Sequence, residues 1–383
     1  MHDAIVVGAG PAGGMAARRI AAAGFRTLVL EKKRVVGEPV QCAEGVSHFG
    51  LVSNGLRPSD EWVVQGVRGA RCFLPGGSSF TITDLPGYSI DRARFDRWIV
   101  QGAVDTGADL RTGTRVTGLA RTDRGWRVRA DGESFDARVV IGADGPTSLL
   151  GRIAGCVTST DLIRAYEYRF PRGAVAIPEE DRFHLFVAQR YEGGYAWVFP
   201  RGDEVNVGAG GHIDAYAATM AFCRERGIDP GRRIATIAGT IPYRFDVRAY
   251  ALPGFAIAGD AAGVTNPMNG AGIHPGLFTG RHAGACAAAS LADEDPDVML
   301  EYDRIVRASP FVDPVLLWAI ERFRTWDDGL LDSVGAELDG RSWRDVDLPL
   351  ALSVLLRKPW LVPRSRSFLR ILRALDLCER YGW

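Results

Sequence analysis

Apolar and polar positions along the first 31 residues follow the order strand, helix, strand. Ile5–Val7 is a continuous apolar run, which is typical of a strand buried on both faces of a parallel sheet. Ala12–Ala23 is rich in alanine and follows Pro11, which suits the first turn of a helix because its missing N–H needs no partner there. Arg26–Glu31 then predicts a second strand.

Several further segments carry the pattern of strands. Val64–Ile82 alternates weakly about a turn at Gly76–Gly77 and predicts a hairpin of a second sheet. Runs separated by turns between residues 161 and 211 predict an antiparallel sheet lying over the first unit. The other strands expected are Arg111–Val116, Trp126–Ala130, Ala137–Gly145, Arg164–Phe170, Arg182–Ala188, Tyr195–Phe199, Glu204–Ala209 and Phe255–Asp260.

Helical spacing completes the predicted organisation. Asp91–Gly107 has apolar residues at helical spacing, and Asp91 can cap its N-terminus. We expect another helix through Arg281 to about Leu291, and helices beyond residue 296. The fold class is therefore α/β (α+β overall): a Rossmann-like domain with a mostly parallel sheet, an interleaved antiparallel-sheet domain and a C-terminal helical region. The first should contain residues 1–62, 86–155 and 246–295, the second 63–85 and 156–245, and the third 296–383.

Composition narrows the class of protein. The 383 residues are 46% hydrophobic, enough to bury a sizeable core. A formal net charge of zero argues against nucleic-acid binding through bulk charge. The six cysteines form no C-x-x-C pair, so we expect neither a metal site nor a disulfide framework. No signal peptide is evident and the apolar run Leu348–Leu356 is too short to span a bilayer, which favours a cytoplasmic protein.

A glycine fingerprint stands between the first predicted strand and helix. Gly8, Gly10 and Gly13 have the spacing G-x-G-x-x-G. The first permits the tight turn, the second lets a pyrophosphate approach the backbone, and the third lets the helix pack on the strand. Glu31 ends the second strand, where a carboxylate meets a ribose hydroxyl. The alternative is a turn that binds nothing, but this context favours FAD or NAD over NADP.

Two other segments carry residues whose role the pattern leaves open. Cys42, in the loop Gly37–Ser47, is either a small buried hydrophobe or a residue beside the reactive ring of the cofactor. Tyr195, Trp197 and Phe199 share one face of a strand. That face is either packed against another layer or the wall of an apolar ligand cavity.

A loop after the last predicted strand holds a second set of cofactor candidates. Asp260 stands where a carboxylate can bind a ribityl or ribose hydroxyl, and Gly272 and Ile273 lie near the start of the next helix. Backbone N–H groups at a helix start favour negative charge, as on the pyrimidine side of a reduced flavin. Arg92, at the start of an earlier helix, is either a solvated surface charge or a cofactor contact.

The C-terminal region mixes basic and aromatic residues. Such a stretch is either a solvated helix face or a peripheral membrane contact. The residues concerned are Arg357, Lys358, Trp360, Arg364, Arg366, Phe368, Arg370 and Arg373.

Several of these elements carry a family resemblance. Three of them together resemble the FAD-binding part of the para-hydroxybenzoate hydroxylase-like flavoproteins: Gly8–Gly13, Asp144-Gly145 and Gly259-Asp260. PVQCAEGVS at residues 39–47 and YAWVFP at 195–200 resemble the geranylgeranyl reductase family, most closely its archaeal digeranylgeranylglycerophospholipid reductases. The resemblance covers roughly residues 1–290. That family binds FAD and saturates isolated C=C bonds in the isoprenoid chains of membrane ether lipids.

The resemblance implies a set of site residues in an FAD-dependent oxidoreductase acting on CH–CH groups. The cofactor-binding residues would be Gly8, Gly10, Ala12, Gly13, Glu31, Cys42, Ala43, Gly45, Arg92, Val116, Asp260, Gly272 and Ile273. The residues lining the lipid tunnel would be Tyr195, Trp197, Phe199 and Pro200. Cys42 is also our candidate for a catalytic residue that positions or protonates at the flavin ring.

The chemistry of an isolated alkene sets the expected mechanism. With no carbonyl to accept electron density, hydride addition alone would leave an unstabilised carbanion. We therefore expect proton delivery coupled to hydride transfer from N5 of the reduced flavin, in an apolar, aromatic-lined cavity. Gly208–Gly211 breaks the fingerprint spacing, so no separate NADPH domain is expected and the donor is NADPH docking transiently or reduced ferredoxin. The alternatives are a flavin-dependent monooxygenase or halogenase of the same fold, or a non-catalytic isoprenoid-lipid binder.

Overall fold

The computed structural model describes residues 1–346, 354, 357 and 365–381. Its first sheet has eight strands, and the main path runs in the order β17-β18-β11-β1-β2-β8. Neighbours along this path are parallel except β17 and β18, and β9 and β10 extend β11 as an antiparallel ribbon. The strands are β1 His2–Val7, β2 Thr27–Leu30, β8 Asp109–Arg111, β9 Val116–Thr122, β10 Gly125–Ala130, β11 Glu133–Gly142, β17 Ala251–Leu252 and β18 Phe255–Ile257.

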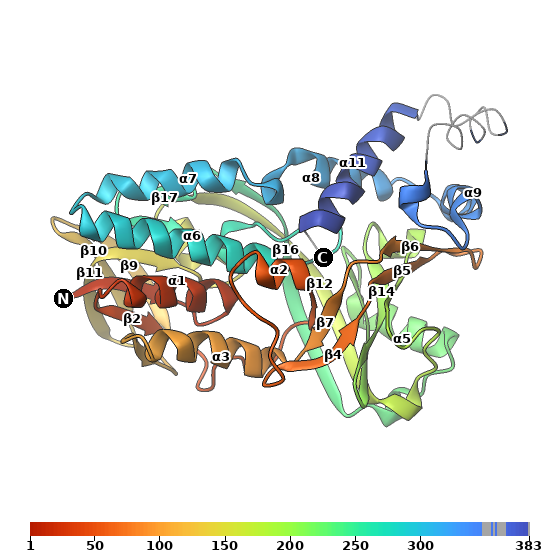
Figure 1. Ribbon diagram of the computed structural model, residues 1–383, viewed down its shortest axis with the longest axis horizontal. Helices are drawn as coiled ribbons and strands as arrows, with labels where there is room; N and C mark the ends of the chain where they lie inside the picture. The colour runs from red at the N-terminus through yellow and green to blue at the C-terminus, as the bar shows by residue number, and fades with distance from the viewer. Residues whose placement is uncertain (347–353, 355–356, 358–364, 382–383) are drawn as a thin grey trace.

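A row of helices covers one face of this sheet (Figure 1). The row consists of α3 Arg92–Val104, α1 Pro11–Ala22, α6 Ile273–Ala292 and α7 Leu300–Arg307. Helices α1 and α6 approach each other at backbone distance, since a Cβ at Gly280 would lie 2.1 Å from the carbonyl oxygen of Ala12. Both helices begin at the same end of the sheet, so their N-termini meet beside the carboxyl end of β1.

The second sheet has seven strands in the order β16-β12-β15-β14-β13-β5-β6. All its neighbours are antiparallel except β13 and β5. Val205 and Val207 pack with Phe222 of α5, Ala215–Glu225, whereas the alternate residues of β15 face the opposite side. The strands are β5 Ala70–Phe73, β6 Ser79–Thr83, β12 Val157–Pro171, β13 Phe183–Phe186, β14 Tyr195–Arg201, β15 Glu204–Gly211 and β16 Ala235–Val247.

A small third sheet and the C-terminal helices complete the fold. The small sheet is β3-β7-β4, with β3 Gly45–Ser47, β4 Val63–Val67 and β7 Gly87–Ile90. The remaining helices are α2 His48–Val52, α4 Leu149–Ile153, α8 Pro314–Phe323, α9 Asp328–Leu338 and α11 Ser365–Tyr381. Leu316 of α8 and Ile371 of α11 share one core with Cys72 of β5. Among the described helices, none has the length and apolarity needed to cross a bilayer.

The predicted fold class is confirmed: a mostly parallel sheet, a mostly antiparallel sheet and C-terminal helices. Two strand predictions were wrong in detail. Arg111–Val116 is not one strand, because a turn at Gly113, with φ +65°, separates β8 from β9. Only β5 and β6 form the predicted hairpin, since the turn at Gly69 sends β4 to the small sheet instead. The apolar run Leu348–Leu356 lies outside the described residues except for Val354.

Candidate active site

A cavity of about 550 Å³ lies where the carboxyl end of the first sheet meets the inner face of the second. Its nucleotide end is formed by the turn between β1 and α1, and its sheet end by β12 and β14. All the residues predicted to bind the cofactor line it: Gly8, Gly10, Ala12, Gly13, Glu31, Cys42, Ala43, Gly45, Arg92, Val116, Asp260, Gly272 and Ile273. Tyr195, Trp197 and Phe199 line it too. The tertiary structure thus brings both predicted sets into one space.

Pro200 is the exception, and its predicted place in the lining was wrong. It follows Phe199 in β14, and successive side chains of a strand point to opposite faces. Its carbonyl accepts a hydrogen bond from the hydroxyl of Ser89 in β7, so this residue joins β14 to the small sheet instead of facing the cavity.

The three glycines of the turn differ in what requires them. Gly8 has φ +102°, and a Cβ there would lie 2.1 Å from the carbonyl oxygen of Ala143. A Cβ at Gly13 would lie 1.8 Å from the carbonyl oxygen of Gly8. At Gly10, in contrast, the built Cβ meets nothing within 4 Å and φ is an ordinary −77°. The fold itself requires Gly8 and Gly13, whereas the space beside Gly10 is free for a ligand.

Polar groups at the nucleotide end suit the two halves of a dinucleotide. Helices α1 and α6 begin without a side-chain cap, so their first N–H groups are available to anionic oxygens such as those of a pyrophosphate. Glu31 is buried at the end of β2 and accepts hydrogen bonds from the N–H groups of Ala9, at 2.7 Å, and Lys33, at 2.8 Å. Its remaining acceptor capacity faces the cavity, as a ribose hydroxyl requires.

Two further carboxyl groups line this end. Asp260 Oδ1 accepts a hydrogen bond from the hydroxyl of Thr265 at 2.8 Å, and burial raises the pKa of Asp260. Asp144 Oδ2 accepts from the N–H of Leu150, but its buried Oδ1 has no partner among the described residues. A buried acceptor without a partner is costly, and a cofactor hydroxyl or N–H would satisfy it. The residues present therefore fit FAD.

The loop after the first unit makes Cys42 part of the cavity lining. Its Sγ accepts a hydrogen bond from the N–H of Glu44 at 3.2 Å. Burial raises the pKa of Cys42, so its sulfur is a neutral thiol at neutral pH instead of a thiolate nucleophile. The neighbouring Arg92 holds Asp96 through two hydrogen bonds of 3.1 Å and also lines the cavity. A catalytic role for Cys42 remains a prediction.

Glu44, which the sequence analysis missed, anchors this loop to the second sheet. Its side chain is 1% exposed and accepts a hydrogen bond from the N–H of Arg92 at 2.9 Å. It also pairs with the guanidinium groups of Arg169 and Arg201, the latter at 2.9 Å. Glu44 has φ +68°, a conformation uncommon outside glycine. Nothing in the local sequence signals this role, because both arginines come from strands far along the chain.

The aromatic residues of β14 lie beside one another along the sheet end. Ring centroids are 5.8 Å apart for Tyr195 and Trp197, and 6.4 Å for Trp197 and Phe199. The hydroxyl of Tyr195 donates to the carbonyl of Asn269 at 2.5 Å. The expected shared face is therefore a cavity wall.

A glycine makes room for one of these rings, that of Trp197. Trp197 pairs with Gly208 of β15, and Gly208 pairs in turn with Glu167 of β12, so the three residues form one row on one face. A Cβ at Gly208 would lie 2.4 Å from Cζ2 of Trp197. The indole of Trp197 lies over Gly208, which has no side chain, and the indole Nε1 donates to Oε2 of Glu167 at 2.7 Å. Gly210 occupies the same position opposite Tyr195.

Glu167 is the second residue that the sequence analysis missed. It lines the cavity, is 2% exposed, and has no hydrogen-bond partner for Oε1 among the described residues. Its signal in the sequence is a charged residue two positions from Ala165, which also lines the cavity, and so on the inward face of β12. That face is recognisable only once the sheet's orientation is known.

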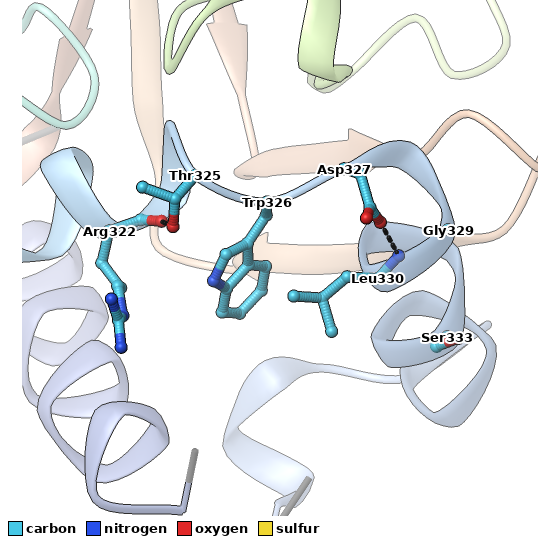
Figure 2. Close-up of a pocket in the computed structure, with 7 residues that line it drawn as sticks. All are labelled: Arg322, Thr325, Trp326, Asp327, Gly329, Leu330 and Ser333. Atoms are coloured by element: carbon cyan, nitrogen blue, oxygen red, sulfur yellow. Dashed lines mark hydrogen bonds between the residues drawn. The ribbon is translucent and has the colours of Figure 1, made fainter. Parts of the chain in front are cut away.

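A second cavity, of about 420 Å³, lies apart from this site where α8 leads into α9 (Figure 2). Figure 2 shows the Asp327 carboxylate turned back to the N–H of Leu330, which caps α9 at 2.7 Å. None of the predicted site residues lines it.

The basic C-terminal stretch is only partly described. Arg357 pairs with Glu337 at 2.7 Å and Arg373 with Asp313 at 2.8 Å. The residues outside the description are Lys358, Trp360 and Arg364, together with the side chains of Arg366 and Phe368. Membrane contact by this stretch therefore remains a prediction.

A glycine turn at the carboxyl end of a parallel sheet, with a second sheet closing a cavity over it, defines the chain as a flavoprotein that binds FAD. A model of the FAD binding domain family matches residues 3–66. Digeranylgeranylglycerophospholipid reductase 2 of Methanopyrus kandleri is 36% identical over 76% of this chain and 78% of its own length. Digeranylgeranylglycerophospholipid reductase 1 of Methanothermobacter thermautotrophicus is 32% identical over 96% of this chain and 97% of its own. The chain belongs to the digeranylgeranylglycerophospholipid reductase family.

Solved structures agree with this assignment. A geranylgeranyl bacteriochlorophyll reductase-like protein from Thermoplasma acidophilum superposes with a TM-score of 0.83 at 25% identity, covering 98% of this chain and 99% of that one. A triple mutant of the flavin-dependent brominase Bmp2 superposes with a TM-score of 0.69 at 17% identity, covering 94% of this chain and 99% of that one. The brominase shows the shared fold alone, so the fold does not separate reductases from halogenases.

Proposed function

We propose that this protein is an FAD-dependent reductase that saturates the C=C bonds of geranylgeranyl chains in membrane ether lipids. Family membership supports this proposal. The observation that carries it is the continuity of one cavity from the dinucleotide turn to the aromatic wall. An extended apolar chain against Tyr195, Trp197 and Phe199 would lie next to the position of the cofactor. Bound FAD, when reduced, supplies hydride.

The chain's own residues orient the substrate, exclude water and stabilise charge. The aromatic faces attract the positive charge that develops on an alkene carbon during protonation. The N-terminus of α6, at Gly272 and Ile273, favours negative charge on the reduced cofactor. Gly208 has no side chain, so the Trp197 indole can lie over it and form part of the cavity wall.

Lipid reduction by chemically reduced protein tests the proposed function. The FAD-loaded protein is reduced with dithionite without oxygen and then mixed with a geranylgeranyl ether lipid. We expect the flavin to reoxidise and mass spectrometry to detect a gain of two mass units for each double bond reduced. A saturated lipid should leave the flavin reduced. Oxygen uptake with NAD(P)H and an aromatic substrate would instead favour a monooxygenase, and an unchanged flavin spectrum would favour a binding protein.

An external electron donor must reduce the flavin again after each turnover. We propose that this donor is NADPH or reduced ferredoxin. The chain has one glycine fingerprint in the context of a strand and a helix, which FAD occupies. A second dinucleotide would therefore have to dock transiently. Comparing the rates of anaerobic flavin reduction by NADPH and by reduced ferredoxin distinguishes the two donors. We also propose that the protein works in the cytoplasm at the membrane surface, where its substrate lies.

Gly10→Val should abolish FAD retention without unfolding the protein. A Cβ at this position meets no protein atom within 4 Å, but the valine side chain fills the space that the pyrophosphate needs. We expect FAD affinity to fall at least tenfold, while the free energy of unfolding without FAD falls by no more than about 1 kcal/mol, the cost of an unsuitable N-cap. Gly66→Val is the matched control, since its Cβ also meets nothing within 4 Å. Equal FAD content in both variants would contradict this placement of the pyrophosphate.

Tyr195→Ala should impair lipid reduction while FAD stays bound. A buried aromatic side chain contributes about 1.5–3 kcal/mol, so kcat/KM for the lipid should fall by tenfold or more. Tyr216→Ala, at a tyrosine that is 53% exposed, is the control and should keep the wild-type value. The flavin absorbance of the purified variants reports the cofactor content. Loss of FAD from Tyr195→Ala would assign that residue a structural role instead.

A further inference from the structure

Glu167 carries a buried carboxyl group on a side chain that lines the active-site cavity. Its side chain reaches the sheet end of the cavity from β12, on the wall that Trp197 and Phe199 also form. Trp197 Nε1 donates to one carboxyl oxygen at 2.7 Å. The other oxygen, Oε1, is buried and has no hydrogen-bond partner among the described residues. This is the carboxyl oxygen that the protein leaves without a partner, on a side chain that lines the cavity.

The surroundings keep this carboxyl protonated. Burial raises the pKa of Glu167 to about 8, and the Glu44 carboxylate also raises it. The hydrogen bond from Trp197 and the charges of Arg169 and Arg201 act in the opposite direction. The strands on either side of Glu167 present Gly208 and Ile237, which carry no charge. Glu167 therefore holds a proton at neutral pH but can release it.

We propose that Glu167 is the acid that protonates the alkene, an inference that rests on the proposed reductase function. Trp197 fixes one oxygen of the carboxyl group and leaves the other without a partner, on a side chain that lines the cavity. Cys42 lines the same cavity from the loop beside Arg92, and burial keeps its thiol neutral. Proton delivery is thus assigned to Glu167 of the second sheet, beside the aromatic residues of β14.

The step balances without a further reactant. The O–H bond of Glu167 breaks, and its proton forms a C–H bond at the less substituted alkene carbon, so that positive charge develops on the more substituted one. That carbon receives the hydride supplied by reduced FAD, which is oxidised by two electrons as the alkene is reduced by two. Glu167 is left as a carboxylate, hydrogen-bonded by Trp197, and regains a proton from solvent.

Glu167→Gln tests this assignment, because the amide keeps the shape and an acceptor oxygen for Trp197 but cannot act as the acid. Single-turnover reduction of a geranylgeranyl ether lipid by dithionite-reduced, FAD-loaded protein is followed between pH 6 and pH 10. We expect the wild-type rate to be level at low pH and to fall tenfold per pH unit above about pH 8. The variant should be at least 100-fold slower and lack this decline.

Two controls separate chemistry from structure. Glu225→Gln, at a glutamate whose side chain is 47% exposed, should match the wild type in rate and pH dependence. Cys42→Ala should keep the decline near pH 8 even if its rate falls. Infrared spectra are recorded for the wild type and Glu167→Gln without lipid at pH 6.5. The wild type should show the C=O band of a protonated carboxyl group, and this band should be absent from Glu167→Gln. FAD absorbance and thermal unfolding verify that the variant is folded.

Several results would overturn the proposal. They are a wild-type rate in Glu167→Gln, a decline near pH 8 that persists in the residual activity of that variant, or an ionised Glu167 in the infrared spectrum at pH 6.5. A wild-type protein that leaves the lipid unchanged would overturn the proposed function and this inference together. A wild type that reduces the lipid beside an equally active variant would overturn the inference alone.

Discussion

Replacing Glu44 with alanine should lower the free energy of unfolding by about 1–3 kcal/mol, the usual cost of leaving buried polar groups short of a hydrogen-bond partner. Arg169 and Arg201, whose side chains are 15% and 9% exposed, would each lose this partner, although Glu204 still pairs with both. Alanine also has a Cβ, so the strain at φ +68° is similar in both proteins and does not contribute to the difference. The measurement is urea-induced unfolding at pH 7 with FAD at one saturating concentration.

Glu38→Ala is the matched control for Glu44→Ala. Glu38 pairs with Arg97 at 2.7 Å, but the two side chains are 53% and 41% exposed. Surface pairs of this kind contribute between zero and about 1 kcal/mol. A Glu44→Ala protein no less stable than Glu38→Ala would show that Arg169 and Arg201 are adequately solvated without the carboxylate, and that Glu44 does not anchor the Cys42 loop.

Glu167→Gln should stabilise the protein at alkaline pH, by about 3–5 kcal/mol at pH 9. The pKa of Glu167 is about 8 in the folded protein, against an ordinary value of 4.5. Below pH 4.5 both the folded and unfolded states hold the proton. Between pH 4.5 and pH 8 only the folded state does, so the wild-type free energy of unfolding falls as pH rises, by about 1.4 kcal/mol per unit. Glutamine does not titrate, so the variant does not lose this free energy.

Thermal or urea unfolding at pH 5, 7 and 9 measures this difference. The gain from Glu167→Gln should be small at pH 5 and grow toward pH 9, whereas Glu225→Gln should show no such growth. A gain that is constant with pH would mean that the carboxyl group does not have a raised pKa in the folded state. This experiment needs no lipid and no turnover, so it reports the protonation state independently of the chemistry.

The sequence alone predicted those elements whose structure depends on residues close together in the chain. Gly8 is required by its φ of +102° and Gly13 by its contact with Gly8, both within one strand–turn–helix unit, so their spacing predicts the dinucleotide turn directly. Asp91 accepts from the N–H of Arg94, as expected of an N-cap residue. The two-residue period of β14 likewise placed Tyr195 and Phe199 on one face.

Only the tertiary structure determined which side chains meet in the cavity between these elements. Glu44 meets its arginines from β12 and β14, and Glu167 meets Trp197 across a glycine of a third strand, so the contacts depend on strand order and register. Pro200 fails the lining prediction for a local reason instead, since a one-residue step in a strand reverses the face. Sequence determined the cofactor turn, the fold class and the family of this protein, because those signals lie within short stretches of chain. Which carboxyl groups are buried, paired or left free in the cavity was decided only when distant strands were placed side by side.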